Sequence, residues 1–282
     1  MKLKKIKSYA KINLSLGVTG RLRDGYHKIE SLVSFIYLYD EIKIKKIFNK
    51  NHKIKFFGKF SKGIKKQNTI SNLFKVLDKK NLLNNNKYLV EIKKNIPQKS
   101  GLGGGSMNAS AILKFFTSKN ILNLPQKNLI NLSKKIGSDV KLGLTNKNKI
   151  LYSNGNLFSS SRKIGLFVVV IKPNFGCSTK KIYKSVKKFS SIKLRKNKIS
   201  NFSILNIKKM QNHLEKIAFK YYPKLKKIKI FMEKLPNIYF VRMTGSGSSL
   251  VGYFLTKNTA INAVKLLKKK YKNYWCIQSK TI

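Results

Sequence analysis

The sequence predicts a mixed α+β fold rather than a doubly wound parallel sheet. Segments with the two-residue alternation of strands and segments with helical spacing follow one another without a regular strand–helix–strand repeat. With 282 residues, of which 42% are hydrophobic, the chain is long enough to bury a sizeable core. We expect one large domain or two modest ones, with a boundary near residue 160 that separates 1–160 from 161–282.

The first part of the chain contains several segments typical of strands. Apolar runs at 6–18 and 32–47 are joined by a polar turn, and a shorter strand is expected at 52–58. Residues 68–81 then show the spacing of an amphipathic helix. Residues 87–97 are typical of a strand and lead directly into a cluster of glycines.

Helices are predicted after the glycine cluster. Apolar residues recur there at helical intervals, so one helix is expected to begin near Ser106 and a second to occupy 126–137. Residues 149–158 predict a hairpin around the turn pair Asn154–Gly155.

The second half begins with a strongly apolar strand at 163–173. Helical patterns follow around 179–188, 203–219 and 225–235. A loop of small residues at 244–249 then separates two strands, and a final helix and strand close the chain.

The net charge of +53 is extreme and at first sight favours a nucleic-acid partner, because clustered cations release counterions from phosphate backbones. Only five of the 62 basic residues are arginine, however, although arginine is favoured in phosphate and base contacts for its bidentate geometry. Lysine is spread through almost every segment, which is typical of a compositional drift of the whole chain. We expect no dedicated nucleic-acid partner, although the charge would attract anionic small substrates.

The sequence also predicts a cytoplasmic protein without a membrane partner. No apolar run approaches the ~18 residues of a membrane span. Lys11 and Asn13 interrupt the apolar part of the basic N-terminus, so a signal peptide is not expected. Cys177 and Cys276 show no metal-ligand spacing, which fits a reduced compartment.

The segment Gly101–Ser106, Gly-Leu-Gly-Gly-Gly-Ser, is the most informative one. Its glycines precede a predicted helix, where unpaired backbone N–H groups and the helix dipole favour an anion. Glycine lets such a backbone approach a phosphate closely, and Ser106 is expected to cap the helix or to offer its hydroxyl to a phosphate or metal. The alternative is an ordinary flexible turn. The segment lacks the Gly-Lys-Ser/Thr ending of a P-loop and the acidic residue that follows a dinucleotide-binding fingerprint.

Three segments together resemble the GHMP kinase family. They are "YAKINLSLGVTGRLRDGYHKIESL", "IPQKSGLGGGSMNASAIL" and "RMTGSGSSLVGYF", in the family's order and over most of the chain. The resemblance implies the GHMP kinase fold, with an N-terminal ribosomal-protein-like α/β domain and a C-terminal ferredoxin-like α+β domain. It also implies transfer of the γ-phosphoryl group of ATP, with Mg²⁺, to a small-molecule hydroxyl. The first segment resembles family members whose substrate carries a cytidine diphosphate group.

Two kinds of alternative stay open at this point. Homoserine and mevalonate kinases belong to the same family, but their substrates contain no base for aromatic residues to sandwich. A basic nucleic-acid-binding protein is the alternative from another class, and it would have no use for a glycine loop together with Lys11 and Asp139. We expect a monomer or a homodimer.

The resemblance implies which residues carry the chemistry. Phosphoryl transfer to an alcohol needs a proton acceptor, charge neutralisation and in-line positioning. By this resemblance, Asp139, one of nine acidic residues, stands at the position of the family's catalytic base. Lys11 stands at the position of the residue that pairs with this base and polarises the attacking hydroxyl. Without the resemblance, Asp139 would be an ordinary turn residue and Lys11 a solvent-facing strand residue. The residues expected at ATP are Pro97, Gly101, Leu102, Gly103, Gly104, Gly105 and Ser106, with Asn68 near the adenine.

The resemblance also implies a substrate site. Asn13 is expected to bind substrate, Tyr26 to stack on cytosine, His27 to hydrogen-bond the base, Thr179 to contact the polyol part and Tyr183 to cover the opposite face of the base. The loop of Thr244, Gly245, Ser246 and Gly247 is expected to shape the active site, or else to be a tight turn.

Two lysines depart from the family pattern. Lys99 precedes the glycine loop, where it either adds a phosphate contact or reflects the lysine drift, and Lys141 stands where a proline often occurs. No acidic residue near the loop is an evident metal ligand, so Mg²⁺ is expected to be held mainly by ATP phosphates and water.

Overall fold

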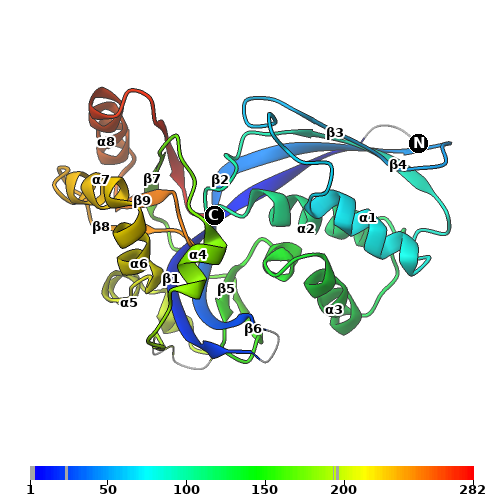
Figure 1. The fold of residues 1–282 in the computed structure, drawn as a ribbon, viewed down its shortest axis with the longest axis horizontal. Coiled ribbons are helices and arrows are strands. Elements are labelled where there is room, and N and C mark those ends of the chain that lie inside the picture. The colour runs from blue at the N-terminus through cyan, green and yellow to red at the C-terminus, as the bar shows by residue number, and fades with distance from the viewer. Residues whose placement is uncertain (1–3, 23–24, 193, 195–196) are drawn as a thin grey trace. The chain divides into compact units, whose positions relative to one another are not determined.

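The chain forms two compact units, each with its own strands, helices and core (Figure 1). The computed structural model describes residues 4–22, 25–192, 194 and 197–282. Unit 1 consists of residues 1–11, 38–98 and 103–146, and unit 2 of residues 12–37, 99–102 and 147–282. The units follow contacts rather than chain order, and the expected boundary near residue 160 stays a prediction. Arg23 and Arg195, two of the five arginines, lie outside the described residues, as does part of the turn expected before Tyr26.

Unit 1 combines a sheet with three helices. Its strands are ordered β3 (Lys53–Phe57), β4 (Lys87–Lys93) and the second half of β2 (His27–Ile47), with β4 parallel to β3 and antiparallel to β2. β1 (Lys4–Arg21) pairs with β2, and both strands contribute residues to both units. The helices α1 (Thr69–Lys79), α2 (Gly104–Ser118) and α3 (Gln126–Ile136) lie on one side of β3 and β4 (Figure 1), and a short 3-10 helix spans Val140–Leu144.

Helix α1 illustrates how local sequence sets an element of unit 1. Asn68 caps it, because its Oδ1 accepts hydrogen bonds from the backbone N–H groups of Ile70 and Ser71 at 2.9 and 3.2 Å. The Ser71 hydroxyl in turn accepts from the Asn68 N–H at 2.8 Å, which completes a reciprocal capping box. The apolar stripe of α1 is buried in the core of unit 1 and comprises Ile70, Leu73, Phe74 and Leu77.

Unit 2 is built on an antiparallel four-stranded sheet. Its strand order is β10 (Trp275–Lys280), β7 (Phe167–Lys172), β9 (Leu250–Phe254) and β8 (Phe240–Met243). The hairpin of β5 (Asn148–Leu151) and β6 (Leu157–Ser160) pairs with the first half of β2 through β5. The helices are α4 (Thr179–Lys184), α5 (Ile204–Lys209), α6 (Leu214–Tyr221), α7 (Pro223–Glu233) and α8 (Lys257–Lys270), with a 3-10 turn at Ile199–Phe202. Helix α8 packs on β7, β9 and β10, and α7 on β8 and β9 (Figure 1).

The helical pattern at 203–219 suggested one helix, and this prediction is wrong. The structure has two helices there, α5 and α6. Between them, the backbone pairs with β1 instead of continuing the helix. The Leu16 N–H donates to the Gln211 carbonyl at 3.0 Å, and the His213 N–H donates to the Leu16 carbonyl at 2.9 Å. Asn212 then accepts a hydrogen bond from the Leu214 N–H at 3.0 Å, where α6 begins. Helix α4 is also shorter than the pattern at 179–188 suggested, since it ends at Lys184.

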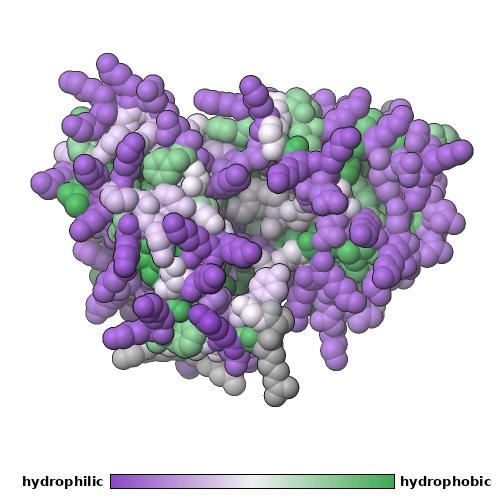
Figure 2. Space-filling view, in the orientation of Figure 1, coloured by the Kyte–Doolittle hydropathy of each residue, from purple (hydrophilic) through white to green (hydrophobic). Residues whose placement is uncertain are grey.

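The other expected elements are present, although β4 ends at Lys93 and α2 begins at Gly104, and the α+β class is confirmed. The strands expected at 6–18 and 32–47 are β1 and β2, and the expected hairpin turns at Asn154–Gly155, where Gly155 has a φ of +83°. None of the helices in the described part of the chain is long and apolar enough to cross a membrane. Hydrophilic side chains cover most of the visible face and do not gather on one element (Figure 2).

Candidate active site

In unit 1, the structure brings Lys11 and Asp139 together. The Lys11 Nζ lies 3.4 Å from the Asp139 Oδ2. The Lys11 side chain, on β1, is only 5% exposed, whereas the Asp139 side chain, directly before the 3-10 helix, is 40% exposed. A nearly buried cation therefore lies against a carboxylate that solvent, and a small molecule, can reach.

The glycine loop contacts the Lys11 side chain directly. Gly103 caps α2 in the left-handed region, with a φ of +71°. A Cβ placed on Gly103 would lie 2.8 Å from the Lys11 Cγ, so glycine lets the lysine side chain pass. The first helical hydrogen bond runs from the Met107 N–H to the Gly103 carbonyl at 2.8 Å. The backbone N–H groups of residues 104–106 therefore have no acceptor within the helix. Such unpaired N–H groups at the start of a helix can bind an anion.

One of the two roles expected for Ser106 was to cap α2, and this expectation is wrong, because the capping residue is Gly103. The helix begins at Gly104 rather than near Ser106, so Ser106 lies within its first turn. The physical reason is that Gly103 adopts the positive φ that turns the chain into the helix. The other expected role, a hydroxyl offered to a phosphate or metal, stays a prediction.

The segment that carries Asp139 is fixed on α2. The Ser110 hydroxyl, on α2, donates a hydrogen bond to the Val140 carbonyl. A Cβ on Gly143 would lie 2.7 Å from the Ser110 Cβ and 2.9 Å from the Met107 Sδ, so the 3-10 helix packs closely on α2. The helix that starts with the glycine loop therefore also positions the carboxylate.

Lys141 lies two residues after Asp139 in the same 3-10 helix. Burial lowers the pKa of Lys141, and the Lys134 charge lowers it further, against the opposing effect of Asp139. This lysine is thus a buried part of the segment and differs from the many lysines that only cover the surface.

Four further residues expected at ATP have clear positions. Pro97 and Leu102 are buried. A Cβ on Gly104 would lie 3.1 Å from the Ile96 side chain, and one on Gly105 would lie 3.1 Å from the Thr69 hydroxyl. The side chain of Asn68 is engaged in capping α1, and its expected place at the adenine stays a prediction.

In unit 2, one buried hydroxyl joins residues of all three segments that resemble the family. Thr244 is 0% exposed, and its Oγ1 accepts a hydrogen bond from the Asn13 N–H at 3.0 Å. The same hydroxyl lies 3.2 Å from the Gly101 carbonyl, to which it can donate. Gly101 has a φ of +77°, and a Cβ there would lie 2.1 Å from the Thr244 carbonyl oxygen, so only glycine fits.

Sequence reasoning missed the residues that hold the loop of Thr244. The Asn212 Nδ2 donates to the carbonyls of Met243 and Gly245 at 2.8 and 2.7 Å. The Arg242 guanidinium is 5% exposed and donates to backbone carbonyls of Leu14, Ile207, Lys208 and Met210. An arginine inside an otherwise apolar strand was the signal for this role, since a buried charge needs partners.

His27 and Tyr183 lie together in unit 2. Their ring centroids are 5.2 Å apart at an interplanar angle of 42°. The His27 Nε2 is buried and has no hydrogen-bond partner among the described residues. Burial, and then the Arg21 charge, lower the pKa of His27 below its ordinary value of 6.5. Tyr26 is 69% exposed, so its ring is accessible.

The remaining predicted residues of unit 2 are Thr179, Asn13 and those of the loop after Thr244. The Thr179 hydroxyl, at the start of α4, lies 2.9 Å from the Ser246 hydroxyl. The Asn13 Nδ2 donates to the Ser31 hydroxyl at 2.8 Å. Gly245 and Gly247 both have positive φ, which the turn of this loop requires.

The described residues of the two units form no cage for a metal. Across residues 4–22, 25–192, 194 and 197–282, no group of three His, Cys, Asp or Glu side chains is placed to hold a metal ion. Cys177 and Cys276 are free and buried, and burial raises the pKa of Cys177 to about 11. Burial therefore favours the protonated thiol of Cys177, which is not the nucleophilic form.

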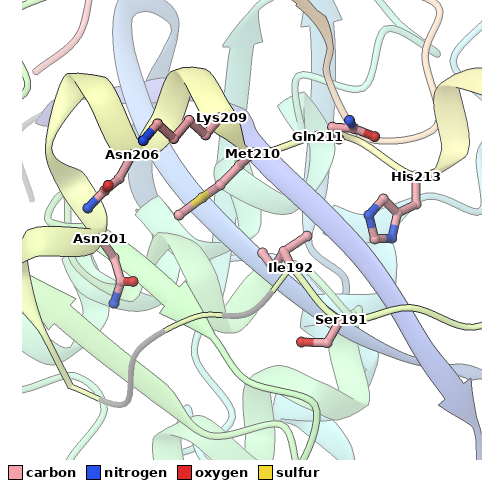
Figure 3. A pocket seen from close by; sticks show the side chains of 8 residues that line it. All are labelled: Ser191, Ile192, Asn201, Asn206, Lys209, Met210, Gln211 and His213. Carbon is pink, nitrogen blue, oxygen red and sulfur yellow. The ribbon is translucent and has the colours of Figure 1, made fainter.

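Unit 2 also contains a cavity that none of the predicted residues lines. Its volume is about 420 Å³, and in Figure 3 the side chains of Asn206, Lys209 and Met210, from α5 and the residue after it, lie opposite Ser191 and Ile192. Asn201, Gln211 and His213 complete the lining.

Family models and known proteins match this chain over most or all of its length. Residues 68–147 match the GHMP kinases N terminal domain, and residues 194–273 match the GHMP kinases C terminal domain. A 4-diphosphocytidyl-2-C-methyl-D-erythritol kinase of Pelagibacter ubique is 50% identical over 99% of both chains. An enzyme of the same name from Clostridium perfringens is 31% identical over 95% of this chain and 94% of its own.

Solved structures share the fold. The crystal structure of a 4-(cytidine 5'-diphospho)-2C-methyl-D-erythritol kinase has a TM-score of 0.76 at 22% identity, with 98% of this chain and 99% of that chain covered. A homoserine kinase from Cytophaga hutchinsonii has a TM-score of 0.70 at 14% identity, with 100% and 95% covered.

Proposed function

This chain belongs to the GHMP kinase family, and we propose that it phosphorylates the 2-hydroxyl of 4-diphosphocytidyl-2-C-methyl-D-erythritol with ATP. The products are the 2-phosphate and ADP, in the non-mevalonate route to isoprenoid precursors. The observation that carries the proposal is the 50% identity to a kinase of this name over nearly the whole of both chains.

The glycine loop binds the ATP phosphates through its residues 103–106, which belong to unit 1. The unpaired N–H groups at the start of α2 and the positive end of its dipole attract the phosphate oxygens. Gly103 and its neighbours keep side chains out of the way, and the Ser106 hydroxyl adds a donor. Mg²⁺ enters as part of the ATP complex, because magnesium gives up its water reluctantly and is usually held by phosphates and water together.

Asp139 is the general base of the proposed reaction. Its half-exposed carboxylate accepts the proton of the substrate hydroxyl as the oxygen attacks the γ-phosphorus, and the bond to the ADP oxygen breaks in line. Lys11, 3.4 Å away, orients the carboxylate and stabilises negative charge on the attacking oxygen. No covalent phospho-enzyme is formed.

In unit 2, the substrate's cytidine group is bound by aromatic side chains. The accessible ring of Tyr26 and the ring of Tyr183 stack on cytosine. The Nε2 of His27, which has no hydrogen-bond partner among the described residues, hydrogen-bonds the polar edge of the base. Thr179 and Asn13 bind the polyol part, and the loop Thr244–Gly247 shapes the site. We further propose that the enzyme works in the cytoplasm, in keeping with its free cysteines.

A panel of acceptors tests the proposal. The purified protein is given ATP and, separately, the diphosphocytidyl substrate, homoserine or mevalonate, and ADP release is measured. We expect turnover with the diphosphocytidyl substrate alone. Turnover with homoserine or mevalonate instead would place the chain with another member of the family. Tight, salt-sensitive RNA binding that ATP does not displace, without turnover, would favour a nucleic-acid-binding protein.

A further inference from the structure

A buried carboxylate of unit 1, Asp40 on β2, lies outside the proposed chemistry. It is 0% exposed, so it cannot act on a substrate. Its Oδ1 accepts hydrogen bonds from the backbone N–H groups of Asn95 and Ile96 at 2.7 and 2.8 Å. Its Oδ2 accepts from the Lys94 ammonium group and from the Asn108 Nδ2, the latter at 3.0 Å. Four donors therefore converge on one side chain.

These donors lie on both sides of the glycine loop in the sequence. Lys94, Asn95 and Ile96 form the segment that enters the loop, and Asn108 lies one turn into α2, the helix that leaves it. The Lys94 Nζ would be 3.2 Å from a Cβ on Gly104, so the ammonium group lies directly against the first residue of α2. Asp40 thus connects the entry and the exit of the loop.

Charge and burial make the loss of any one partner in this arrangement costly. The Lys94 side chain is 5% exposed and the Asp40 side chain 0%, so the ion pair lies in a medium of low dielectric constant. Buried ion pairs gain little net stability, but the loss of one partner leaves an uncompensated charge. Asn108 is 1% exposed, and its Oδ1 has no hydrogen-bond partner in the described part of the chain, so the bond to Asp40 sets its orientation.

We propose that Asp40 is a positioning residue for the ATP phosphates. It holds the segment 94–96 and, through Asn108, the N-terminal part of α2 in one geometry, so that the N–H groups at the start of α2 point to fixed places. Donors to a phosphate must be held within a fraction of an ångström to bind well, which a loop of glycines does not achieve alone. This inference rests on the proposed function, because it assumes that the loop binds ATP.

The decisive variant is Asn108→Ala, which removes only the connection to α2. Asp40→Asn is a harsher change, because it leaves the Lys94 ammonium group buried without its counter-ion. Asn72→Ala is the matched control, since the Asn72 Nδ2 connects two other elements of unit 1 by donating to the Ile136 carbonyl at 2.9 Å. Asn72 belongs to neither the glycine loop nor the Asp40 cluster.

The readouts are the Kd of MgATP, measured by calorimetry without acceptor, the KM of the acceptor and the Tm. We expect Asn108→Ala to weaken MgATP binding about tenfold, a coupling of moderate size, and to leave the KM of the acceptor within about twofold. Asn72→Ala should lower the Tm without changing the Kd of MgATP. A merely structural role of Asp40 would change the Tm alone.

Two results would overturn the inference. One is a Kd of MgATP for Asn108→Ala within about twofold of that of the unmodified protein, and the other is an equal weakening by Asn72→Ala. If the unmodified protein binds MgATP and either result is found, only the role of Asp40 fails. If the unmodified protein does not bind MgATP, the proposed function itself fails, and the inference fails with it.

Discussion

Replacement of Thr244 by valine removes the hydroxyl that joins the three segments in unit 2. Valine has nearly the same shape, so the change acts mainly on hydrogen bonds. The Asn13 N–H, 3.0 Å from the hydroxyl, loses its acceptor, and the Gly101 carbonyl, 3.2 Å away, loses a donor. Thr244 is 0% exposed, so water cannot replace the lost partner without a local rearrangement.

The expected loss of stability follows from these two contacts. A buried N–H left without an acceptor costs about 1–3 kcal/mol, and the lost bond to the carbonyl adds about 1 kcal/mol. We therefore expect Thr244→Val to lower the free energy of unfolding by about 2–4 kcal/mol, a large part of the roughly 5–15 kcal/mol typical of a folded domain. Thr244→Ser is the matched control, because it keeps the hydroxyl and loses one methyl group, at about 1 kcal/mol.

Urea unfolding of the two variants measures the difference. The fluorescence of Trp275, the one tryptophan of the chain, reports on β10 and therefore on unit 2. The midpoint should fall in the order unmodified protein, Thr244→Ser, Thr244→Val, with similar m-values. A valine variant as stable as the serine variant would show that the hydroxyl does not hold these segments, and the reasoning from its contacts would be refuted.

Three further changes have definite expected results. Gly103→Ala forces the Lys11 side chain aside, since the added Cβ would lie 2.8 Å from its Cγ, and we expect kcat to fall about a hundredfold or more. Because folding lowers the pKa of His27, the contribution of this residue to stability should be present above pH 6.5 and be lost as the pH falls below 6.5. The difference in urea midpoint between the unmodified protein and His27→Gln should show this pH dependence. A pH-independent difference would contradict it. Arg242→Met leaves several buried carbonyls without donors and should lower the free energy of unfolding by about 2–4 kcal/mol in the same assay, whereas a stability unchanged from that of the unmodified protein would contradict the role of the guanidinium.

Elements with strong local signals could be predicted from the sequence. Helix α1 has a capping residue and an apolar stripe, and the hairpin of β5 and β6 has an Asn-Gly turn, so neighbouring residues decide both. The break between α5 and α6 could not be predicted in this way. The break depends on pairing with Leu16, nearly two hundred residues earlier in the chain. The helix propensity of residues 203–219 gives no information about that distant partner.

The candidate site could be predicted where the resemblance to the family implies individual side chains. It implied Lys11 and Asp139 as a pair, and the structure places the Lys11 Nζ 3.4 Å from the Asp139 Oδ2. The supporting residues were missed for a physical reason. Asp40, Asn212 and Arg242 act largely through backbone groups of other segments, so their partners have no sequence signature. A buried charge within an apolar strand was the one available signal, and for Arg242 and Asp40 it was present.

The kinetics of Asp139→Asn test the proposed mechanism most directly. The variant keeps the size of the side chain but cannot accept the hydroxyl proton. With ATP and 4-diphosphocytidyl-2-C-methyl-D-erythritol, the unmodified protein should release ADP and form the 2-phosphate, and Asp139→Asn should reduce kcat by a factor on the order of 10² to 10⁴ while MgATP still binds. No turnover by the unmodified protein, or full turnover by Asp139→Asn, would contradict it.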